Sequence, residues 1–140
     1  MLIVGYGNRG RGDDGAGAMV AGRLQELGMD AEICTGDAFS LIGAWNSDDV
    51  VVVDAMVTGA PAGTVRLWNG RQVRFQGSPA ASTHGLGVAE AIELARALGR
   101  LPQRLRVFGI EGRSFAIGSD ISPEVMHAVE KITRLLAESQ

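Results

Sequence analysis

The sequence predicts an α/β fold: a three-layer α/β/α sandwich with a mostly parallel five-stranded sheet and an antiparallel edge hairpin. Short apolar runs alternate with helical patterns along the chain, which is typical of βαβ units. Residues 49–54 read Asp-Val-Val-Val-Val-Asp, and four valines without alternation indicate a central strand that is buried on both faces. Residues 64–68 and 73–76 flank a short turn that contains Asn69-Gly70, which predicts the hairpin.

The first half of the chain contains two further strands and two helices. Residues 2–4 form a first apolar run, and residues 31–35 form a second. Between them lies a helical pattern that ends at Gly28 and whose apolar face consists of Ala16, Val20, Leu24 and Leu27. A short helix is expected at residues 39–45, ahead of the valine-rich strand.

The second half adds two helices and one strand. Residues 87–98 carry a helical pattern with Gly99 past its end, and residues 104–110 read as a strand. The last helix is expected to begin at Ser122-Pro123, a capping residue followed by the proline that suits a first helical position. Its predicted buried face consists of Val125, Val129, Ile132 and Leu136.

Composition excludes several classes of protein. The 140 residues are 46% apolar and 21% charged, which fits one globular domain, residues 1–140. No apolar run approaches the ~18 residues of a membrane span, and no export signal is visible. A net charge of −3, with both signs mixed along the chain, gives no nucleic-acid footprint. The single cysteine, Cys34, fits a reducing compartment. We therefore expect a cytoplasmic monomer without nucleic-acid or membrane partners.

The glycine-rich segment 5–15 ends in two adjacent aspartates, Asp13 and Asp14, just before the first helix. The dinucleotide-binding pattern G-x-G-x-x-G is matched by Gly5, Gly7 and Gly10. However, carboxylates in the first turn of the helix would repel a phosphate from the amides that bind it. Asp13 is explained by an N-cap, whereas a second aspartate exceeds what a cap needs. We therefore predict that Asp14 is a ligand for a cation.

Two more polar side chains are expected at the same edge of the sheet. The valine-rich strand ends on Asp54, and Ser82-Thr83-His84 precedes the next helix. Since ligands bind outside the carboxyl ends of parallel strands, Asp14, Asp54 and His84 are predicted to meet there. Two carboxylates and an imidazole suit a divalent transition ion such as nickel, zinc or copper, with a position left open for an outside ligand.

Each residue also has a structural explanation. The less favoured alternative for Asp54 is an Asx-turn after its strand, and for His84 a bystander position before its helix. Glu111, at the end of the penultimate strand, is a weaker candidate for the same edge. Cys34 is expected to be a small core residue, and His127 to lie on the solvated side of the last helix.

These motifs, in this order, resemble the endopeptidases that mature the large subunit of nickel–iron hydrogenases. The family's first motif, G-x-G-N followed by D-[DE]-x-x-G, is similar to residues 5–8 and 13–17. Its strand ending in D-A is similar to Val53-Asp54-Ala55, and its histidine followed by [QG]-x-G to residues 84–87. Residues 109–111 and 118–123 are also similar to the family, so the resemblance spans most of the chain.

The resemblance implies that the chain removes a C-terminal extension from a hydrogenase large-subunit precursor after nickel insertion. It further implies that Asp14, Asp54 and His84 are both the catalytic and the metal-contacting residues, and that the nickel belongs to the substrate. The roles of Asp37 and of the nearby loop arginines, Arg9 and Arg11, stay open. The cleavage step is expected to be metal-assisted attack, with Asp14 or Asp54 as general base the alternative.

Two other classes of function remain. A non-enzymatic nickel or metallocentre chaperone would use the same three residues but would leave the length of the large subunit unchanged. A small nucleotide-binding domain would use Gly5, Gly7 and Gly10 instead, and the aspartate pair argues against it.

Overall fold

The computed structural model describes residues 1–74 and 86–139, and its centre is a five-stranded sheet in the order β2-β1-β3-β5-β4. The first four of these strands are mutually parallel, and β4 is antiparallel to β5 at the edge. The strands are β1 (Leu2–Tyr6), β2 (Ala31–Cys34), β3 (Asp49–Met56), β4 (Val65–Asn69) and β5 (Arg104–Glu111). The mostly parallel sheet with an antiparallel edge is therefore confirmed.

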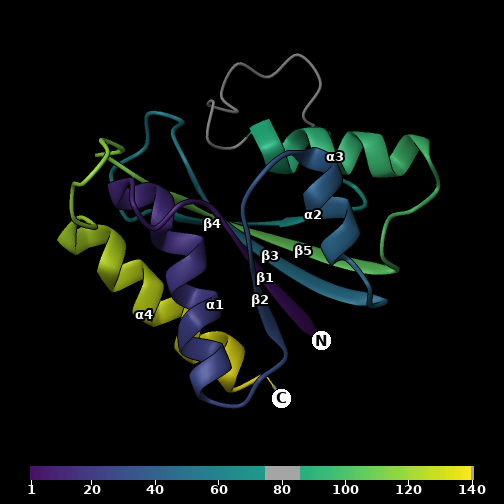
Figure 1. Ribbon diagram of the computed structural model, residues 1–140, viewed down its shortest axis with the longest axis horizontal. Coiled ribbons are helices and arrows are strands. Elements are labelled where there is room, and N and C mark those ends of the chain that lie inside the picture. The colour runs from purple at the N-terminus through teal and green to yellow at the C-terminus, as the bar shows by residue number, and fades with distance from the viewer. Residues whose placement is uncertain (75–85, 140) are drawn as a thin grey trace.

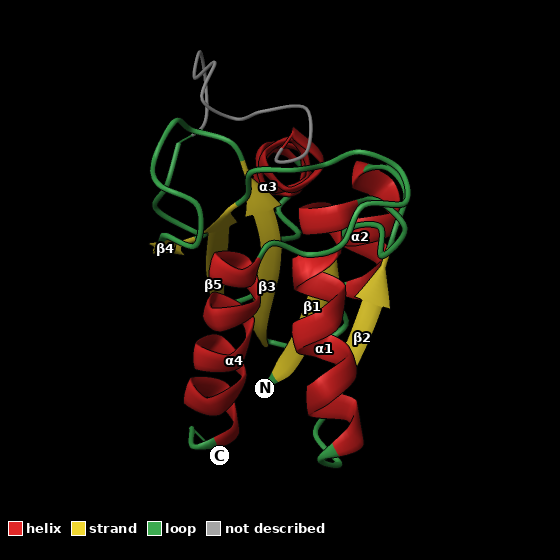
Figure 2. Cartoon of the chain, turned by 90° about the vertical axis from the view of Figure 1, so that its left-hand side faces the viewer, coloured by secondary structure: helices red, strands yellow, loops and turns green. Residues whose placement is uncertain are grey.

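Helices cover both faces of the sheet and make the three predicted layers (Figure 1). One face is packed by α1 and α4, which lie side by side in front of the strands in Figure 2. The other face is packed by α2 and α3. These helices are α1 (Ala16–Glu26), α2 (Ala38–Ala44), α3 (Leu86–Ala97) and α4 (Pro123–Ala137), and a 3-10 turn, η1 (Gly12–Gly15), precedes α1. None of the helices within the described ranges has the length and apolar character needed to span a membrane.

The valine-rich strand lies in the middle of the sheet, as its sequence predicts. β3 pairs with β1 on one side and β5 on the other, and Val50 to Val53 are all fully buried. Their side chains alternate between the two helical layers, with Val50 and Val52 facing one layer and Val51 and Val53 the other. Continuous apolar sequence is required because both faces of this strand are covered.

The predicted edge hairpin is only half correct. β4 forms where expected, but its partner is β5, and the turn after Asn69 leads into Val73 and Arg74, which belong to no strand. The rest of the expected second arm, residues 75–76, lies outside the described residues. The turn signal at Asn69-Gly70 is real, because the N–H groups of Gln72 and Val73 donate to the Asn69 carbonyl oxygen, and the described strand that pairs with β4 is β5.

The strand order reverses between β1 and β3. The chain leaves β1 through α1 to reach β2 on one side, and returns through α2 to β3 on the other. Such a reversal opens a crevice outside the carboxyl ends of the two strands that flank it. The segments that meet there are the loop after β1, which carries η1, and the carboxyl end of β3.

Two glycines allow α1 to pack directly on these strands. A Cβ on Gly5 would overlap the carbonyl oxygen of Gly17, and a Cβ on Gly17 would overlap that of Val53. The glycines therefore bring the helix backbone against the strand backbones, so that the residues just before α1 sit close to the end of β3. Close helix–sheet contact is one of the physical roles of such glycine-rich turns, and it requires no bound phosphate.

Candidate active site

Asp14 is the last acidic residue of the loop that joins β1 to α1. Its side chain is 8% exposed, and one carboxylate oxygen, Oδ2, accepts a hydrogen bond of 3.0 Å from the backbone N–H of Asn8. Gly7 has a φ of +138°, and a Cβ there would overlap the Asp14 carbonyl oxygen. The G-x-G-N motif thus provides both the turn and the donor that place the Asp14 carboxylate.

Asp54 lies on β3, two residues before the strand ends at Met56. This differs slightly from the sequence prediction, which ended the strand on Asp54. The side chain is 4% exposed, and its Oδ1 atom has no hydrogen-bond partner in the part of the chain that the structure describes. Burial, and then the negative charge of Asp14, raise the pKa of Asp54 well above its ordinary value, while the Ala55 N–H opposes them.

The two carboxylates therefore share one edge of the sheet and interact electrostatically. An isolated charge buried without a partner is costly, so an arrangement of this kind favours a proton or a bound cation. His84 lies outside the described residues, so its predicted place beside Asp14 and Asp54 stays a prediction. Among residues 1–74 and 86–139 alone, no group of three metal-ligating side chains is gathered.

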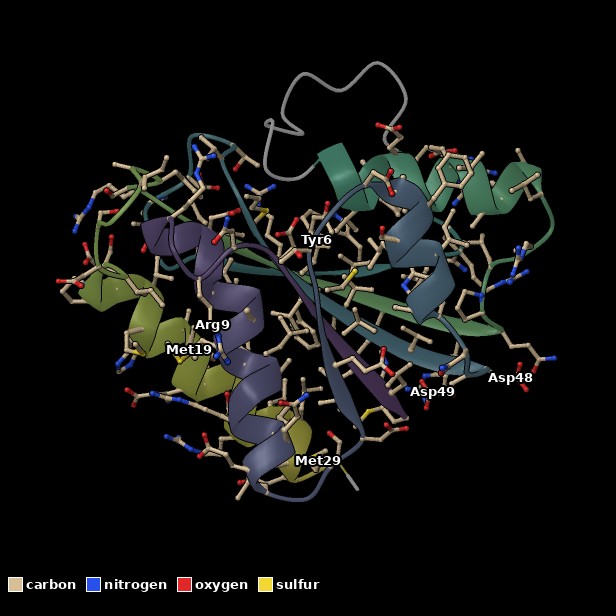
Figure 3. The ribbon with its side chains drawn as sticks, in the orientation of Figure 1. Tyr6, Arg9, Met19, Met29, Asp48 and Asp49 are labelled. Carbon is tan, nitrogen blue, oxygen red and sulfur yellow. The ribbon has the colours of Figure 1, made fainter. Side chains whose placement is uncertain are left out.

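Tyr6 is a neighbour of this pair that sequence reasoning missed. Its hydroxyl donates to the carbonyl oxygen of Gly36, and a Cβ on Gly87, in the first turn of α3, would overlap the phenol ring. Figure 3 shows Tyr6 near the middle of the molecule, where β1 ends. Burial raises the Tyr6 pKa, as do the charges of Asp54, Cys34, Asp14 and Asp37 in decreasing order. No sequence motif predicts that Tyr6 lies beside these carboxylates, because the residues around it come from three separate segments.

Tyr6 is the single tyrosine of the chain, so its ionisation can be followed by ultraviolet absorbance. We expect the folded protein to titrate above the ordinary value of about 10, and Asp54→Asn to shift the midpoint down, because it removes a neighbouring negative charge. A raised pKa stabilises the fold fully below the unfolded value, and this contribution is lost as pH rises through the folded value. An unshifted midpoint in Asp54→Asn would contradict the placement of Tyr6 beside Asp54, and Asp48→Asn, at the opposite end of β3, is the control.

Asp13 is not the N-cap that the sequence suggested, since no side-chain bond caps η1. It is fully buried, and its carboxylate accepts four hydrogen bonds from the segment after β5. The donors are the N–H groups of Arg113 (2.8 Å), Ser114 (3.0 Å) and Ser122 (2.6 Å) and the Ser122 hydroxyl (2.7 Å). Burial raises the Asp13 pKa, but these donors outweigh it, and the pKa lies below its ordinary value.

Asp13 thereby fastens the loop that carries Asp14 to the segment before α4. Its own backbone N–H also donates to the carbonyl oxygen of Ser114, at 2.8 Å. Ser122 does precede α4 as predicted, but its hydroxyl bonds to Asp13, and no side-chain bond caps the helix. The adjacent aspartates therefore have separate tasks: Asp13 secures the loop, and Asp14 lies at the edge with Asp54.

Glu111 lies at the same edge, at the end of β5, but its carboxylate is already hydrogen-bonded to Thr58. It is 1% exposed, and its carboxylate accepts bonds from the Thr58 N–H (2.8 and 3.1 Å) and the Thr58 hydroxyl (2.6 Å). It holds the loop after β3. Asp37 caps α2 by accepting the Ser40 N–H at 3.0 Å, and this bond lowers its pKa.

The remaining candidates have structural explanations. Arg9 lies along α1, as Figure 3 shows, where its guanidinium donates to the Ala18 carbonyl oxygen at 3.2 Å. Arg11 is exposed and reaches the Phe115 carbonyl oxygen at 3.5 Å. Cys34 packs in the core, where burial raises its thiol pKa, and His127 is exposed on α4, both as predicted.

A family model described as hydrogenase maturation protease (HycI) matches residues 35–139 of this chain. The chain belongs to the hydrogenase maturation protease family. The resemblance that the sequence motifs suggest is therefore confirmed, and with it a place among peptidases. The matched residues include Asp54, whereas Asp14 precedes them.

Relatives of this protease family support the same assignment. The chain is 27% identical to the hydrogenase expression/formation protein HupD of Thiocapsa roseopersicina, covering 99% of this chain but 66% of HupD, just under two thirds of its length. Among solved structures, the hydrogenase maturation protease HybD of Thermococcus kodakarensis superposes with a TM-score of 0.81 at 27% identity, covering 98% and 96% of the two chains. The endopeptidase HybD of Escherichia coli gives 0.74 at 26% identity, covering 99% and 92%. The α/β fold is that of these proteases.

Proposed function

We propose that this protein is an endopeptidase that removes the C-terminal extension of a nickel–iron hydrogenase large subunit after nickel has been inserted. The family supports a protease that acts in hydrogenase maturation. The finer part of the proposal is that Asp14, Asp54 and His84 contact nickel carried by the substrate. The cation is then part of what the enzyme recognises, and its presence signals that the precursor is ready for cleavage.

The observation that carries this proposal is the Oδ1 atom of Asp54, which has no hydrogen-bond partner among residues 1–74 and 86–139. It belongs to a side chain that is 4% exposed and lies within electrostatic reach of a second carboxylate, Asp14. A buried polar atom without a partner is rare and calls for an explanation, such as a missing ion. A divalent metal would satisfy this oxygen and relieve the repulsion between the two carboxylates.

Cleavage is proposed to be metal-assisted. Nickel held beside the scissile bond by Asp14, Asp54 and His84 would favour attack by water on the polarised carbonyl carbon. The new C–O bond forms as water loses a proton, and the peptide C–N bond breaks as the leaving amine gains one. A general-base role for Asp14 or Asp54 is the alternative route. Cys34, the single cysteine, is a core residue whose thiol contacts the carbonyl oxygen of Thr35 at 3.8 Å. A buried thiol of this kind is a poor nucleophile.

Mass spectrometry of the large-subunit precursor after incubation with the protein separates this function from that of a metallocentre chaperone. A protease shortens the precursor by its C-terminal extension, whereas a chaperone binds nickel by itself and leaves the precursor mass unchanged. We further propose that the reaction takes place in the cytoplasm and that the protein acts as a monomer on one precursor.

A further inference from the structure

The basic residues of this acidic protein are concentrated in one part of the chain. Between residues 66 and 106 the sequence has two acidic residues, Glu90 and Glu93, and seven of the 13 basic residues. These seven are Arg66, Arg71, Arg74, Arg96, Arg100, Arg104 and Arg106. In sequence the charges look mixed, but the pairing of β4 with β5 brings several of these arginines together at one end of the sheet.

A hollow of about 270 Å³ lies among them, where β4 ends and β5 begins. Its lining includes Leu67, Trp68, Arg71, Gln103, Arg104 and Arg106. This end of the sheet is the one opposite to the candidate active site: β5 runs from Arg104 at the hollow to Glu111 at the active-site edge. Asp49, the ion-pair partner of Arg106, marks it in Figure 3, well away from Tyr6.

Hydrogen bonds from two arginines to backbone carbonyl oxygens fix the turn beside the hollow. Arg96 donates to the carbonyl oxygens of Gly70, Arg71 and Val73, at 3.1, 3.3 and 2.8 Å, and so fixes the turn after β4. Arg71 donates in turn to the carbonyl oxygens of Leu101 and Pro102, at 3.4 and 3.0 Å. Among the described residues, Arg96 pairs with Glu93 and Arg106 with Asp49, whereas Arg71 makes its carbonyl contacts without an ion pair.

The hollow also has apolar surface, and β4, which lines it, is the edge strand of the sheet among the described residues. Leu67 is 56% exposed, and Trp68 is partly exposed beside it. β4 is the last strand of the sheet, and no strand within residues 1–74 and 86–139 pairs with its outer side. An open strand edge binds extended peptides through main-chain hydrogen bonds, while neighbouring side chains select the sequence. Arg104 is exposed at the rim without an ion pair to any described residue.

We propose that this arginine-lined hollow docks an acidic, extended segment of the protein substrate, in addition to the metal-dependent contact at the active site. This inference rests on the proposed function, since it takes the large-subunit precursor as the partner. The net charge of −3 repels a long polyanion such as a nucleic acid, whereas a short acidic segment responds to charges within a Debye length of about 8–10 Å. The arginine-lined hollow therefore favours an acidic peptide.

Charge reversal at the rim tests the proposal. Arg104→Glu is compared with Arg100→Glu, an equally exposed arginine outside the lining of the hollow, so that the change in net charge is matched. The dissociation constant for fluorescently labelled, nickel-loaded precursor is measured by anisotropy, and cleavage is followed by mass spectrometry. We expect Arg104→Glu to weaken binding roughly tenfold, more so at low salt, and Arg100→Glu to stay within about twofold of the wild type.

The outcomes separate the two proposals. Equal binding by Arg104→Glu and Arg100→Glu, with normal cleavage, would overturn the docking surface and leave the protease function standing. Arg104-dependent binding without any cleavage by the wild type would support the docking surface and overturn the protease function. Binding of a single-stranded DNA oligonucleotide that depends on Arg104 and displaces the precursor would overturn the assignment to an acidic peptide.

Discussion

Replacing Asp54 with asparagine is expected to slow processing of the nickel-loaded precursor by roughly 10²–10⁴-fold, the range for losing a group that acts directly at the reacting atoms. The asparagine keeps the shape of the side chain but loses the negative charge that nickel requires. At the same time the variant should be at least as stable as the wild type. Its neutral side chain no longer pays the burial cost and the repulsion from Asp14 that raise the pKa of Asp54.

The sign of the stability effect follows from linkage. A carboxyl group whose folded pKa is raised stabilises the fold fully below its unfolded pKa of about 3.9, and the contribution is lost as pH rises through the folded value. The wild type loses this contribution once the pH exceeds the folded pKa of Asp54, whereas Asp54→Asn does not titrate. Lost activity with retained or raised stability therefore distinguishes a functional carboxylate from a structural one.

Asp14→Asn and His84→Ala are expected to lose processing as Asp54→Asn does. Asp37→Asn is the matched control, because Asp37 lies in the next loop of the same edge but caps α2, a task that asparagine performs as well. Rates are measured from the masses of precursor and product, and stability from urea unfolding. If Asp54→Asn processed the precursor at the wild-type rate, the site would be misassigned. If Asp37→Asn processed it slowly, the site would extend to the loop after β2.

Asp13→Ala is expected to have the largest effect on stability, with a loss of about 3–5 kcal/mol in the free energy of unfolding. The substitution leaves three backbone N–H groups and the Ser122 hydroxyl without their acceptor, in a place that is buried at Ser122 and partly buried at Arg113 and Ser114. Each unpaired buried donor costs about 1–3 kcal/mol, less what local relaxation recovers. Because this carboxylate fastens the loop that carries Asp14, residual folded protein should also process the precursor slowly.

Ser122→Ala provides a graded comparison for Asp13→Ala. It removes one of the four donors and leaves the carboxylate with three backbone partners, so the expected loss is about 1 kcal/mol. Urea unfolding of the wild type and the two variants measures the series. If Asp13→Ala lost no more than Ser122→Ala, the four bonds would not secure the loop, and the separation of tasks between Asp13 and Asp14 would be wrong.

The fold was predictable because its signals are local. Four consecutive valines identify β3, and the apolar periodicity of α1 and α4 appears within single segments. The second arm of the hairpin is not formed at Val73 and Arg74, and the rest of it lies outside the described residues. Asn69-Gly70 does form a turn, but the strand that pairs with β4 is β5, more than thirty residues away. Non-local pairing of this kind leaves no mark in the turn itself.

The proximity of Asp14 and Asp54 was predictable because topology determines it. Asp14 follows β1 and Asp54 lies near the carboxyl end of β3, and these parallel strands flank the reversal of strand order. The task of Asp13 did not follow, because its donors lie about a hundred residues away in a segment without periodicity. Glu111 ends its strand at the correct edge, but its bonds to Thr58 depend on a loop geometry that no sequence pattern specifies.

Paired processing reactions show whether nickel in the substrate is the signal for cleavage. Large-subunit precursor is prepared with and without nickel, incubated with equal amounts of the protein, and analysed by intact-mass spectrometry over time. We predict that only the nickel-loaded precursor is shortened at its C-terminus, and that adding nickel to the protein alone before the reaction does not rescue the nickel-free precursor. Cleavage of both precursors at the same rate would show that nickel is not the signal for cleavage.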